Sequence, residues 1–388
     1  MLIIILCPSA EIISGSLLRP LNIFYSLRGF RNLRVKCIPI KRVSDLLLQL
    51  WRILHANIII ASGVSPWISA FVAVLGRVLK KKVLVDFHGF AWLEANATNA
   101  IGFPMKVLLV SERISYGFSQ YVITASKWLA DALARYFGER KGVFVVENAV
   151  PYVFEKVAHK LMKKYNSNTL RKYACEGVLH CSDCLSKLLF IAPLVSVFKS
   201  NILAYEELLK LRQFLGENVL IVVTGIDRTD VFDIPSNIIS TGYIGYVDYV
   251  ALLLSSDGVI LPYPSNAICG GVRNKVLEAG FCKKPVISTK VGMMHFKALP
   301  MVHYVPFNAL SEKTVHNVKE WELVAQKLHE IVVQQHSFSL FKHSFLTFLG
   351  ILLSYAKKFQ HYCYSSVYVP CQAFDVILKL SLTFMGLA

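Results

Sequence analysis

The first half of the chain alternates short apolar runs with stretches of helical periodicity. Five runs rich in β-branched residues have the length of buried strands, and they cover residues 2–6, 57–62, 83–89, 121–126 and 143–149. Residues 106–118 and 126–137 instead repeat apolar side chains every three or four positions, which predicts amphipathic helices, the second capped by Ser126. Strands that alternate with helices predict a parallel, doubly wound sheet.

The same alternation returns in the second half of the chain. Predicted strands cover residues 187–193, 218–225, 237–242, 258–263 and 285–289, with helical patterns between them at residues 202–215, 249–256 and 272–282. We therefore predict an α/β fold with two Rossmann-like, doubly wound domains, residues 1–150 and 187–335, that face each other across a cleft. A polar, cysteine-containing segment, residues 151–186, joins them, and the apolar tail, residues 336–388, has no assigned structure. Ligands of such folds bind outside the carboxyl ends of the strands.

Three apolar stretches resemble membrane segments, but each has a feature that argues against a span. Residues 56–76 carry no charge over a length that could cross a bilayer, yet Ser65 and Pro66 interrupt them as an N-cap and a first-turn proline. Residues 2–6 lack the basic region of a signal peptide, and residues 344–356 are too short to span. We expect a cytoplasmic protein.

The balance of charge is strongly basic. Forty-two Lys and Arg residues against 25 Asp and Glu residues give a formal net charge of +17, which attracts acidic partners. Cations are dense near the N-terminus, at Arg28, Arg31, Arg34, Lys36, Lys41, Arg42, Lys80, Lys81 and Lys82. Because no nucleic-acid-binding motif accompanies them, we expect no nucleic acid and place an anionic membrane surface first, with the protein peripheral on its inner face. A generally basic surface without such a partner is an alternative that the sequence favours equally.

Three of the nine cysteines lie close together. Cys175, Cys181 and Cys184 surround His180, a combination found in zinc and redox sites. Only one Cys-x-x-Cys pair is present and no second pair follows it. We therefore favour a disulfide or free thiols over a metal site, and predict no metal.

The segment from Gly270 to Glu278 has the chemistry of a nucleotide site. Gly270 and Gly271 precede the predicted helix, where the free N–H groups of a first turn favour an anion and glycine permits close approach. Arg273 and Lys275 add positive charge, and the Glu278 carboxylate, two turns along, can accept hydrogen bonds from a diol. Phosphate followed by sugar hydroxyls describes a nucleotide. An ordinary amphipathic surface helix is the alternative, because a Gly-Gly before a helix is weak evidence.

Several motifs in order resemble the retaining glycosyltransferases of the GT-B fold, which use nucleotide sugars. The resemblance covers about residues 80–335. "ITASKWLADAL" followed by "VFVVENAV" is similar to the passage that closes the first domain of that family, and "LLFIAPLVSVFKSN" resembles the opening of its second domain. The strongest match runs from "TGYIGYVDY" through "GGVRNKVLEAGFCKKPVIST" and resembles the family's phosphate-and-ribose signature.

The resemblance implies a role for each matching residue. It assigns the ribose hydroxyls to Glu278 and the diphosphate to the loop before it, with Asn266, Gly270, Gly271, Val272 and Lys275 as binding residues. It assigns catalytic roles to His88, Lys199 and Arg273, with His88 facing the sugar and Lys199 neutralising the leaving diphosphate. Two positions depart from the family pattern, because Pro193 replaces an arginine and Gly271 replaces a glutamate.

The implied reaction moves a hexose from a nucleoside-diphosphate sugar to an acceptor hydroxyl on a lipid-linked or glycan acceptor. The resemblance implies retention and independence from metal, with no cofactor beside the donor. A catalytically silent relative that binds nucleotide sugars or a membrane is the alternative that Pro193 and Gly271 raise. An epimerase of the same fold is a third.

Overall fold

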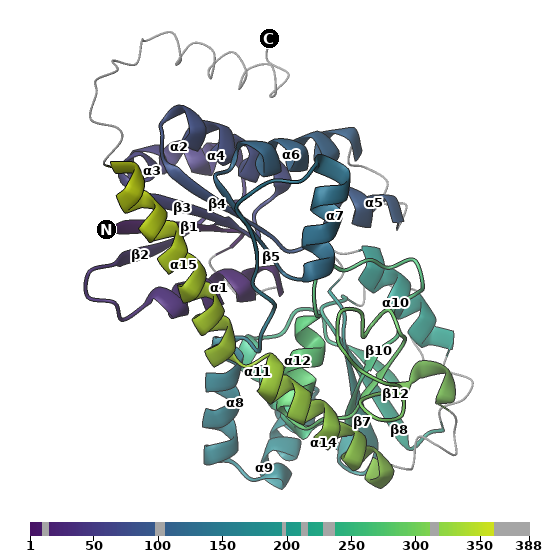
Figure 1. Cartoon of the computed structure of the whole chain (residues 1–388). Helices are drawn as coiled ribbons and strands as arrows, with labels where there is room; N and C mark the ends of the chain where they lie inside the picture. Colours follow the sequence, from purple (N-terminus) through teal and green to yellow (C-terminus); the bar gives the residue numbers. More distant parts are fainter. Residues whose placement is uncertain are drawn as a thin grey trace.

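Two six-stranded parallel sheets form the two halves of the molecule (Figure 1). The structure is a computed structural model that describes residues 1–9, 15–97, 105–195, 199–210, 216–227, 237–310 and 318–360. The first sheet has the order β2-β1-β3-β4-β5-β6, with strands Leu2–Cys7 (β1), Arg34–Pro39 (β2), Ile58–Ser62 (β3), Lys82–Phe87 (β4), Tyr121–Thr124 (β5) and Val143–Val145 (β6).

The second sheet has the order β12-β11-β10-β7-β8-β9. Its strands are Leu188–Pro193 (β7), Val219–Thr224 (β8), Ile238–Ser240 (β9), Gly258–Leu261 (β10), Val286–Ser288 (β11) and Val305–Pro306 (β12). Each sheet pairs its strands in parallel, as in the register Ile4↔Ile59 of β1 and β3 and Phe190↔Ile221 of β7 and β8. The prediction of two doubly wound α/β domains is confirmed.

Alternate residues of the first sheet face two separate cores. In β1, Ile4 and Leu6 belong to a core shared with α2, α3, α4, α6 and α7, whereas Ile3 and Ile5 belong to one shared with α1 and α15. Burial on both faces explains why these strands are continuous apolar runs. The helices of this half span Gly15–Leu27 (α1), Val43–Leu48 (α2), Leu50–His55 (α3), Pro66–Val78 (α4), Ala91–Ala97 (α5), Met105–Phe118 (α6) and Lys127–Phe137 (α7).

Two predicted helix starts are found where the sequence places them. The Ser126 hydroxyl accepts a hydrogen bond from the Leu129 N–H at 3.1 Å, so Ser126 caps α7 as predicted. Pro66 opens α4, and Ser65 is its N-cap residue but makes no capping bond with its side chain. No helix in the described part of the chain is both long enough and apolar enough to cross a bilayer.

The C-terminal helices connect the two halves. The helices that follow β6 in the chain are Tyr152–Lys164 (α8), Ser167–Lys172 (α9), Lys199–Lys210 (α10), Tyr246–Ser255 (α11), Asn274–Phe281 (α12), Val318–Gln335 (α14) and Phe338–Gln360 (α15). Trp321 and Leu328 of α14 pack into the core of the second sheet. Phe345 of α15 packs into the first domain, so the chain returns across both domains (Figure 1). The rest of the predicted apolar tail, residues 361–388, lies outside the described residues.

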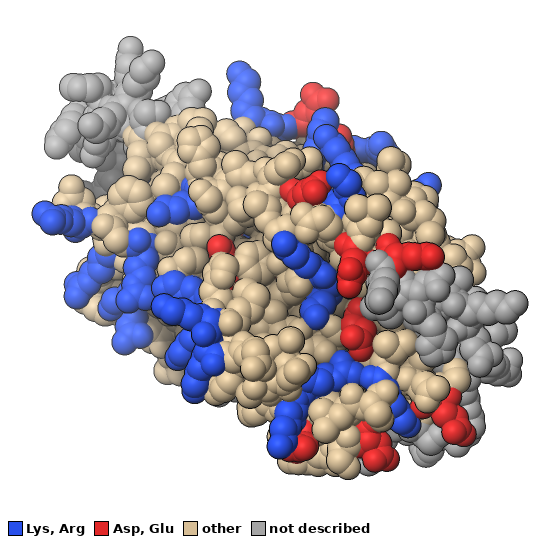
Figure 2. Space-filling view, turned by 90° about the horizontal axis from the view of Figure 1, so that it is seen from below, with Lys and Arg blue, Asp and Glu red and all other residues tan. Residues whose placement is uncertain are grey.

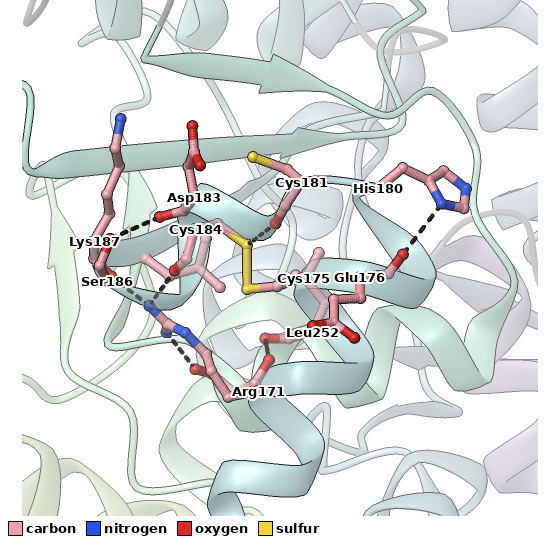
Figure 3. The surroundings of a disulfide bond; sticks show 12 residues. Arg171, Cys175, Glu176, His180, Cys181, Asp183, Cys184, Ser186, Lys187 and Leu252 are labelled. Atoms are coloured by element: carbon pink, nitrogen blue, oxygen red, sulfur yellow. Dashed lines mark hydrogen bonds between the residues drawn. A yellow bond between two sulfur atoms is a disulfide. The ribbon is translucent and has the colours of Figure 1, made fainter.

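The segment between the domains is folded rather than extended. After α8 and α9 come a π-helical turn, Tyr173–Val178, and a 3-10 turn, Ser182–Leu185. Cys175 and Cys184 form a buried disulfide between these turns, and Cys181 is a free thiol (Figure 3). Both interpretations favoured from the sequence are therefore found, a disulfide for Cys175 and Cys184 and a free thiol for Cys181. No group of three or more His, Cys, Asp or Glu residues in the described ranges is arranged to hold a metal ion.

The packing of α15 predicts a strong effect from a single truncation. Phe345 has 0% of its surface exposed, whereas Leu340 on the same helix has 42% exposed. We expect Phe345→Ala to lower the free energy of unfolding of the first domain by about 3–5 kcal/mol, because a large buried side chain leaves a cavity. Leu340→Ala serves as the control and is expected to cost about 0.5 kcal/mol or less. Urea unfolding measures both. Equal losses would contradict the docking of α15 onto the sheet.

Candidate functional site

A cavity of about 320 Å³ lies between the domains, at the carboxyl ends of the strands. The first domain contributes His88, which follows β4, and Asn148, which follows β6. The second domain contributes Pro193 at the end of β7, Gly225 after β8, and the start of α12. This is where a doubly wound fold places its ligand, so the sequence and the structure point to the same cleft.

The two glycines before α12 bring the domains into direct contact. A Cβ atom at Gly270 would overlap the backbone of His88, and one at Gly271 would lie 2.7 Å from the Ala125 Cβ. The Gly270 carbonyl also accepts a hydrogen bond from the Ser126 hydroxyl at 2.5 Å. The absence of side chains at both positions therefore allows the close approach of two backbones.

Several residues that the resemblance assigns to the diphosphate do not line this cavity. Val272 lines the cavity, whereas Gly270 and Gly271 pack against the first domain. Asn266 is exposed, and its side-chain amide donates to the Ala97 carbonyl at 3.0 Å. Lys199 is exposed at the first position of α10 and does not line the cavity.

A buried charge cluster holds His88 in place. Arg19 on α1 contacts both carboxylate oxygens of Asp86, at 2.9 and 3.0 Å. The same carboxylate accepts from the Ser62 hydroxyl at 2.5 Å and lies 2.8 Å from His88 Nε2. Burial by itself raises the pKa of Asp86, but attraction to Arg19 and His88 outweighs it and lowers the pKa to about 2. Asp86 is therefore ionised at neutral pH.

The cluster reaches the second domain through Asn148. Arg19 Nη1 donates to Asn148 Oδ1 at 3.0 Å, and Asn148 Nδ2 donates to the Val272 carbonyl at 2.8 Å. Two hydrogen bonds through Asn148 therefore link α1 of the first domain to the residue just before Arg273. Neither Arg19 nor Asn148 was identified from the sequence. A signal for Asp86 was present, because residues two apart in a strand point to the same side and His88 follows it by two.

Two cations at the start of α12 lie against the side chain of Tyr263. The Arg273 guanidinium carbon lies 3.6 Å from the centre of the Tyr263 ring, and Lys275 Nζ lies 3.1 Å from the Tyr263 hydroxyl. The Tyr263 hydroxyl donates to Asn201 Oδ1 at 2.7 Å. Arg273 Nε and Nη2 are buried and have no hydrogen-bond partner among the described residues. Two unsatisfied donors beside a cavity have the chemistry that suits an anion.

Glu278 lies at the other end of the same cavity wall. Its side chain is buried, and its Oε2 atom accepts a hydrogen bond from the Tyr249 hydroxyl at 2.7 Å. Burial raises the pKa of Glu278 to about 7, although the Tyr249 hydrogen bond and Lys275 act in the opposite direction. The carboxyl group is therefore divided between its neutral and ionised forms near neutral pH.

A second buried carboxyl group faces the cavity from the first domain. Glu94 on α5 lines it, and burial raises the pKa of Glu94 to about 7 despite the attraction of Arg273. The neighbouring Glu112 is also buried, which raises its pKa to about 8. Sequence analysis missed both, because Glu94 follows a strand with no motif around it. Of the predicted residues, the cavity brings together His88, Val272, Arg273, Lys275 and Glu278.

Comparison with known proteins supports the fold. No family model matches the sequence, and no curated protein matches it. Structural similarity is extensive, however. HepE from Anabaena, solved with UDP-glucose, has a TM-score of 0.63 at 14% identity, over 90% of this chain and 99% of that one. Sucrose-phosphate synthase from Thermosynechococcus elongatus has a TM-score of 0.63 at 13% identity, over 93% and 100%.

A third similar structure has a different activity. UDP-GlcNAc 2-epimerase from Neisseria meningitidis, bound to UDP-GlcNAc, has a TM-score of 0.58 at 12% identity, over 91% of this chain and 100% of that one. Identities this low show the fold alone. The two parallel six-stranded sheets with their helices match the GT-B fold, so the resemblance stated from the sequence is confirmed at the level of fold.

The Asp86 cluster predicts a pH-dependent loss of stability. Asp86→Asn is expected to lower the free energy of unfolding at pH 7 by about 3–5 kcal/mol, because Arg19 becomes an uncompensated buried charge. The folded pKa of Asp86, about 2, is below its ordinary value of 3.8. Its linkage contribution, about 2 kcal/mol, is therefore complete above pH 4 and is lost as the pH falls through 2.

Urea unfolding of wild type and Asp86→Asn between pH 5 and pH 2 tests this linkage. We expect the difference between the two proteins to shrink by about 2 kcal/mol towards pH 2. The double variant Arg19→Met/Asp86→Asn is expected to recover part of the loss at pH 7, because both charges are removed together. A difference that stays constant with pH would show that Asp86 has an ordinary pKa.

Proposed function

We propose that the protein is a glycosyltransferase that moves a hexose from a nucleoside-diphosphate sugar to an acceptor hydroxyl. The observation that carries the proposal is the arrangement of one cavity wall: a buried guanidinium with unsatisfied donors at the start of α12, and Glu278 one turn further along the same helix. This order matches a diphosphate followed by a ribose. The GT-B fold, shared with a structure solved with UDP-glucose, agrees with it.

In this proposal the diphosphate lies against Arg273. The guanidinium supplies two donors in a fixed plane, which suits phosphate oxygens, and the free N–H groups at the start of α12 add further positive potential. Lys275, held by Tyr263, is a second cation at the same wall. These groups stabilise the charge that develops on the leaving diphosphate, and they can carry that charge without a metal ion.

Glu278 recognises the ribose in the same proposal. When ionised, its carboxylate accepts hydrogen bonds from both hydroxyls of the diol, while Tyr249 orients it from the other side. Each hydrogen bond to a charged group contributes about 1.5–3 kcal/mol. The proposed role needs the ionised form, and burial raises the pKa of Glu278 to about 7. Donor binding should therefore be coupled to the loss of a proton.

His88 faces the sugar and acceptor from the first domain. Its Nε2 donates to the ionised Asp86, so Nδ1 is the ring nitrogen that this carboxylate does not engage. Asp86, Arg19 and Ser62 thus fix the orientation of the imidazole. We propose that His88 positions the sugar and the acceptor hydroxyl, in a reaction that retains the configuration of the sugar. The acceptor is a hydroxyl of a lipid-linked or glycan molecule.

A catalytically silent relative is the second candidate function. Pro193 lines the cavity where the resembling family has an arginine, and the exposed Lys199 lies outside it. Such a protein binds the donor through Arg273 and Glu278 without turning it over. An epimerase is distinguished by its product, because it alters the sugar of the donor when no acceptor is present.

Calorimetry with UDP, GDP and ADP, each with and without an attached hexose, tests the donor site. We expect binding of one base at micromolar affinity in wild type, and about 10- to 100-fold weaker binding in Glu278→Ala, because the ribose contacts are lost. Leu323→Ala, at an exposed position of α14, is the control and should bind like wild type. Absence of binding for all three bases would contradict the proposal.

The pH dependence of donor binding provides a second test. A UDP-hexose has no group that titrates near neutrality, so a protein group with a pKa near 7 controls the curve. We expect wild type to bind about tenfold more tightly at pH 8 than at pH 6, because Glu278 must be ionised to accept two hydrogen bonds. Glu278→Gln is expected to bind weakly with no such slope. An equal slope in both proteins would assign the titration to another group.

Release of nucleoside diphosphate separates an enzyme from a silent relative. With the donor that calorimetry identifies, we expect wild type to hydrolyse it slowly in the absence of acceptor, and His88→Ala to bind it normally but to lose at least about tenfold in rate. Binding without any release of nucleoside diphosphate, with or without candidate acceptors, would favour the silent relative.

A further inference from the structure

A surface rich in cations lies on α8 and on the turn that follows α1. Six exposed side chains form this surface, called the basic face below: Arg28, Arg31, Lys156, Lys160, Lys163 and Lys164. None of the six lines the cavity between the domains. Figure 2, which views the molecule from below, shows Lys and Arg on both halves, with carboxylates mostly on the right and few of them near the cations on the left.

Aromatic contacts join the two segments of the basic face. The rings of Tyr25 on α1 and Tyr152 on α8 lie 4.5 Å apart between centres. The Arg28 guanidinium lies 6.0 Å from the centre of the Tyr25 ring, and Lys156 Nζ lies 4.7 Å from the centre of the Tyr152 ring. The cations from the two segments therefore share one continuous surface.

The lysines of α8 form a single row. Lys156, Lys160, Lys163 and Lys164 follow one another at helical spacing, so they lie on the same side of the helix. The opposite side of α8 packs Phe154 and Ala158 into the core of the second domain. The lysine row is therefore held on the outside by the way in which α8 is anchored.

Few carboxylates offset this charge. The stretches 28–36 and 152–164 contain one acidic residue, Glu155, whose carboxylate faces His159 at 3.9 Å. No ion pair with a described acidic group involves any of the six cations. A favourable interaction with the helix dipole explains Lys163 and Lys164 in the last turn, but it does not explain Lys156 or Arg31.

We propose that the basic face binds an anionic lipid surface, with α8 lying flat on it. Cations near an anionic membrane are each attracted to the headgroups, and a row along one helix meets a plane along its whole length. Phe30, with 46% of its surface exposed, lies between Arg28 and Arg31 in the sequence and can enter the interface between headgroups and acyl chains. This apolar side chain favours a lipid over a nucleic acid, whose phosphates would meet the cations alone. This proposal does not depend on the donor chemistry.

Co-sedimentation with vesicles tests the proposal. We expect wild type to bind vesicles of 30% phosphatidylglycerol in phosphatidylcholine at 0.1 M salt, and to release at 0.5 M salt, because screening weakens surface electrostatics. Vesicles of phosphatidylcholine alone should bind at least about tenfold less protein. Lys156→Gln/Lys160→Gln/Lys163→Gln/Lys164→Gln is expected to reduce binding to the anionic vesicles at least about tenfold.

A control variant separates the basic face from net charge. The control neutralises four exposed lysines elsewhere, Lys106→Gln/Lys127→Gln/Lys141→Gln/Lys297→Gln. We expect it to bind like wild type, and an equal loss in both variants would overturn the proposal. Substituting the four α8 lysines with arginine keeps the charge and should keep binding, which shows that positive charge at these positions is what the binding requires. Tighter, lysine-dependent binding to a DNA duplex than to anionic vesicles would reassign the face to nucleic acid.

Discussion

The buried ion pair between Arg19 and Asp86 is the interaction on which the cleft depends. A guanidinium and a carboxylate cost several kcal/mol each to remove from water, so the pair persists only where its geometry is satisfied. Here that geometry requires α1, β3 and β4 to meet at one point, with Ser62 and His88 as further partners of the carboxylate. The orientation of His88 is thus a consequence of how the first domain packs.

Direct backbone contact extends this constraint to the second domain. Gly270 and Gly271 have no Cβ to hold the domains apart, and Asn148 links Arg19 to the backbone that leads into α12. His336, at the junction of α14 and α15, makes a second contact with this segment. Its Nδ1 lies 2.9 Å from the Asn148 carbonyl. The positions of His88 and Arg273 relative to each other are therefore set by contacts on both sides of the cleft.

The sequence predicted the features whose pattern is local. The strands of both sheets are continuous apolar runs because both faces are covered, and Ser126 caps α7 as its position before an amphipathic run indicates. It did not predict α15, because a helix that is apolar on many sides has little periodicity and owes its place to Phe345 and its partners from a distant part of the chain. Glu94 and Asn148 were not predicted for the same reason, since their roles come from contacts between domains.

Electrostatics in the cavity favour an anionic ligand. Burial raises the pKa values of Glu94 and Glu278 to about 7, so neither carboxyl group is fully ionised at neutral pH. The positive charges of Arg273 and Lys275 are then only partly compensated by the protein, and Arg273 keeps two donors unsatisfied. A diphosphate supplies both the charge and the acceptors that this wall lacks.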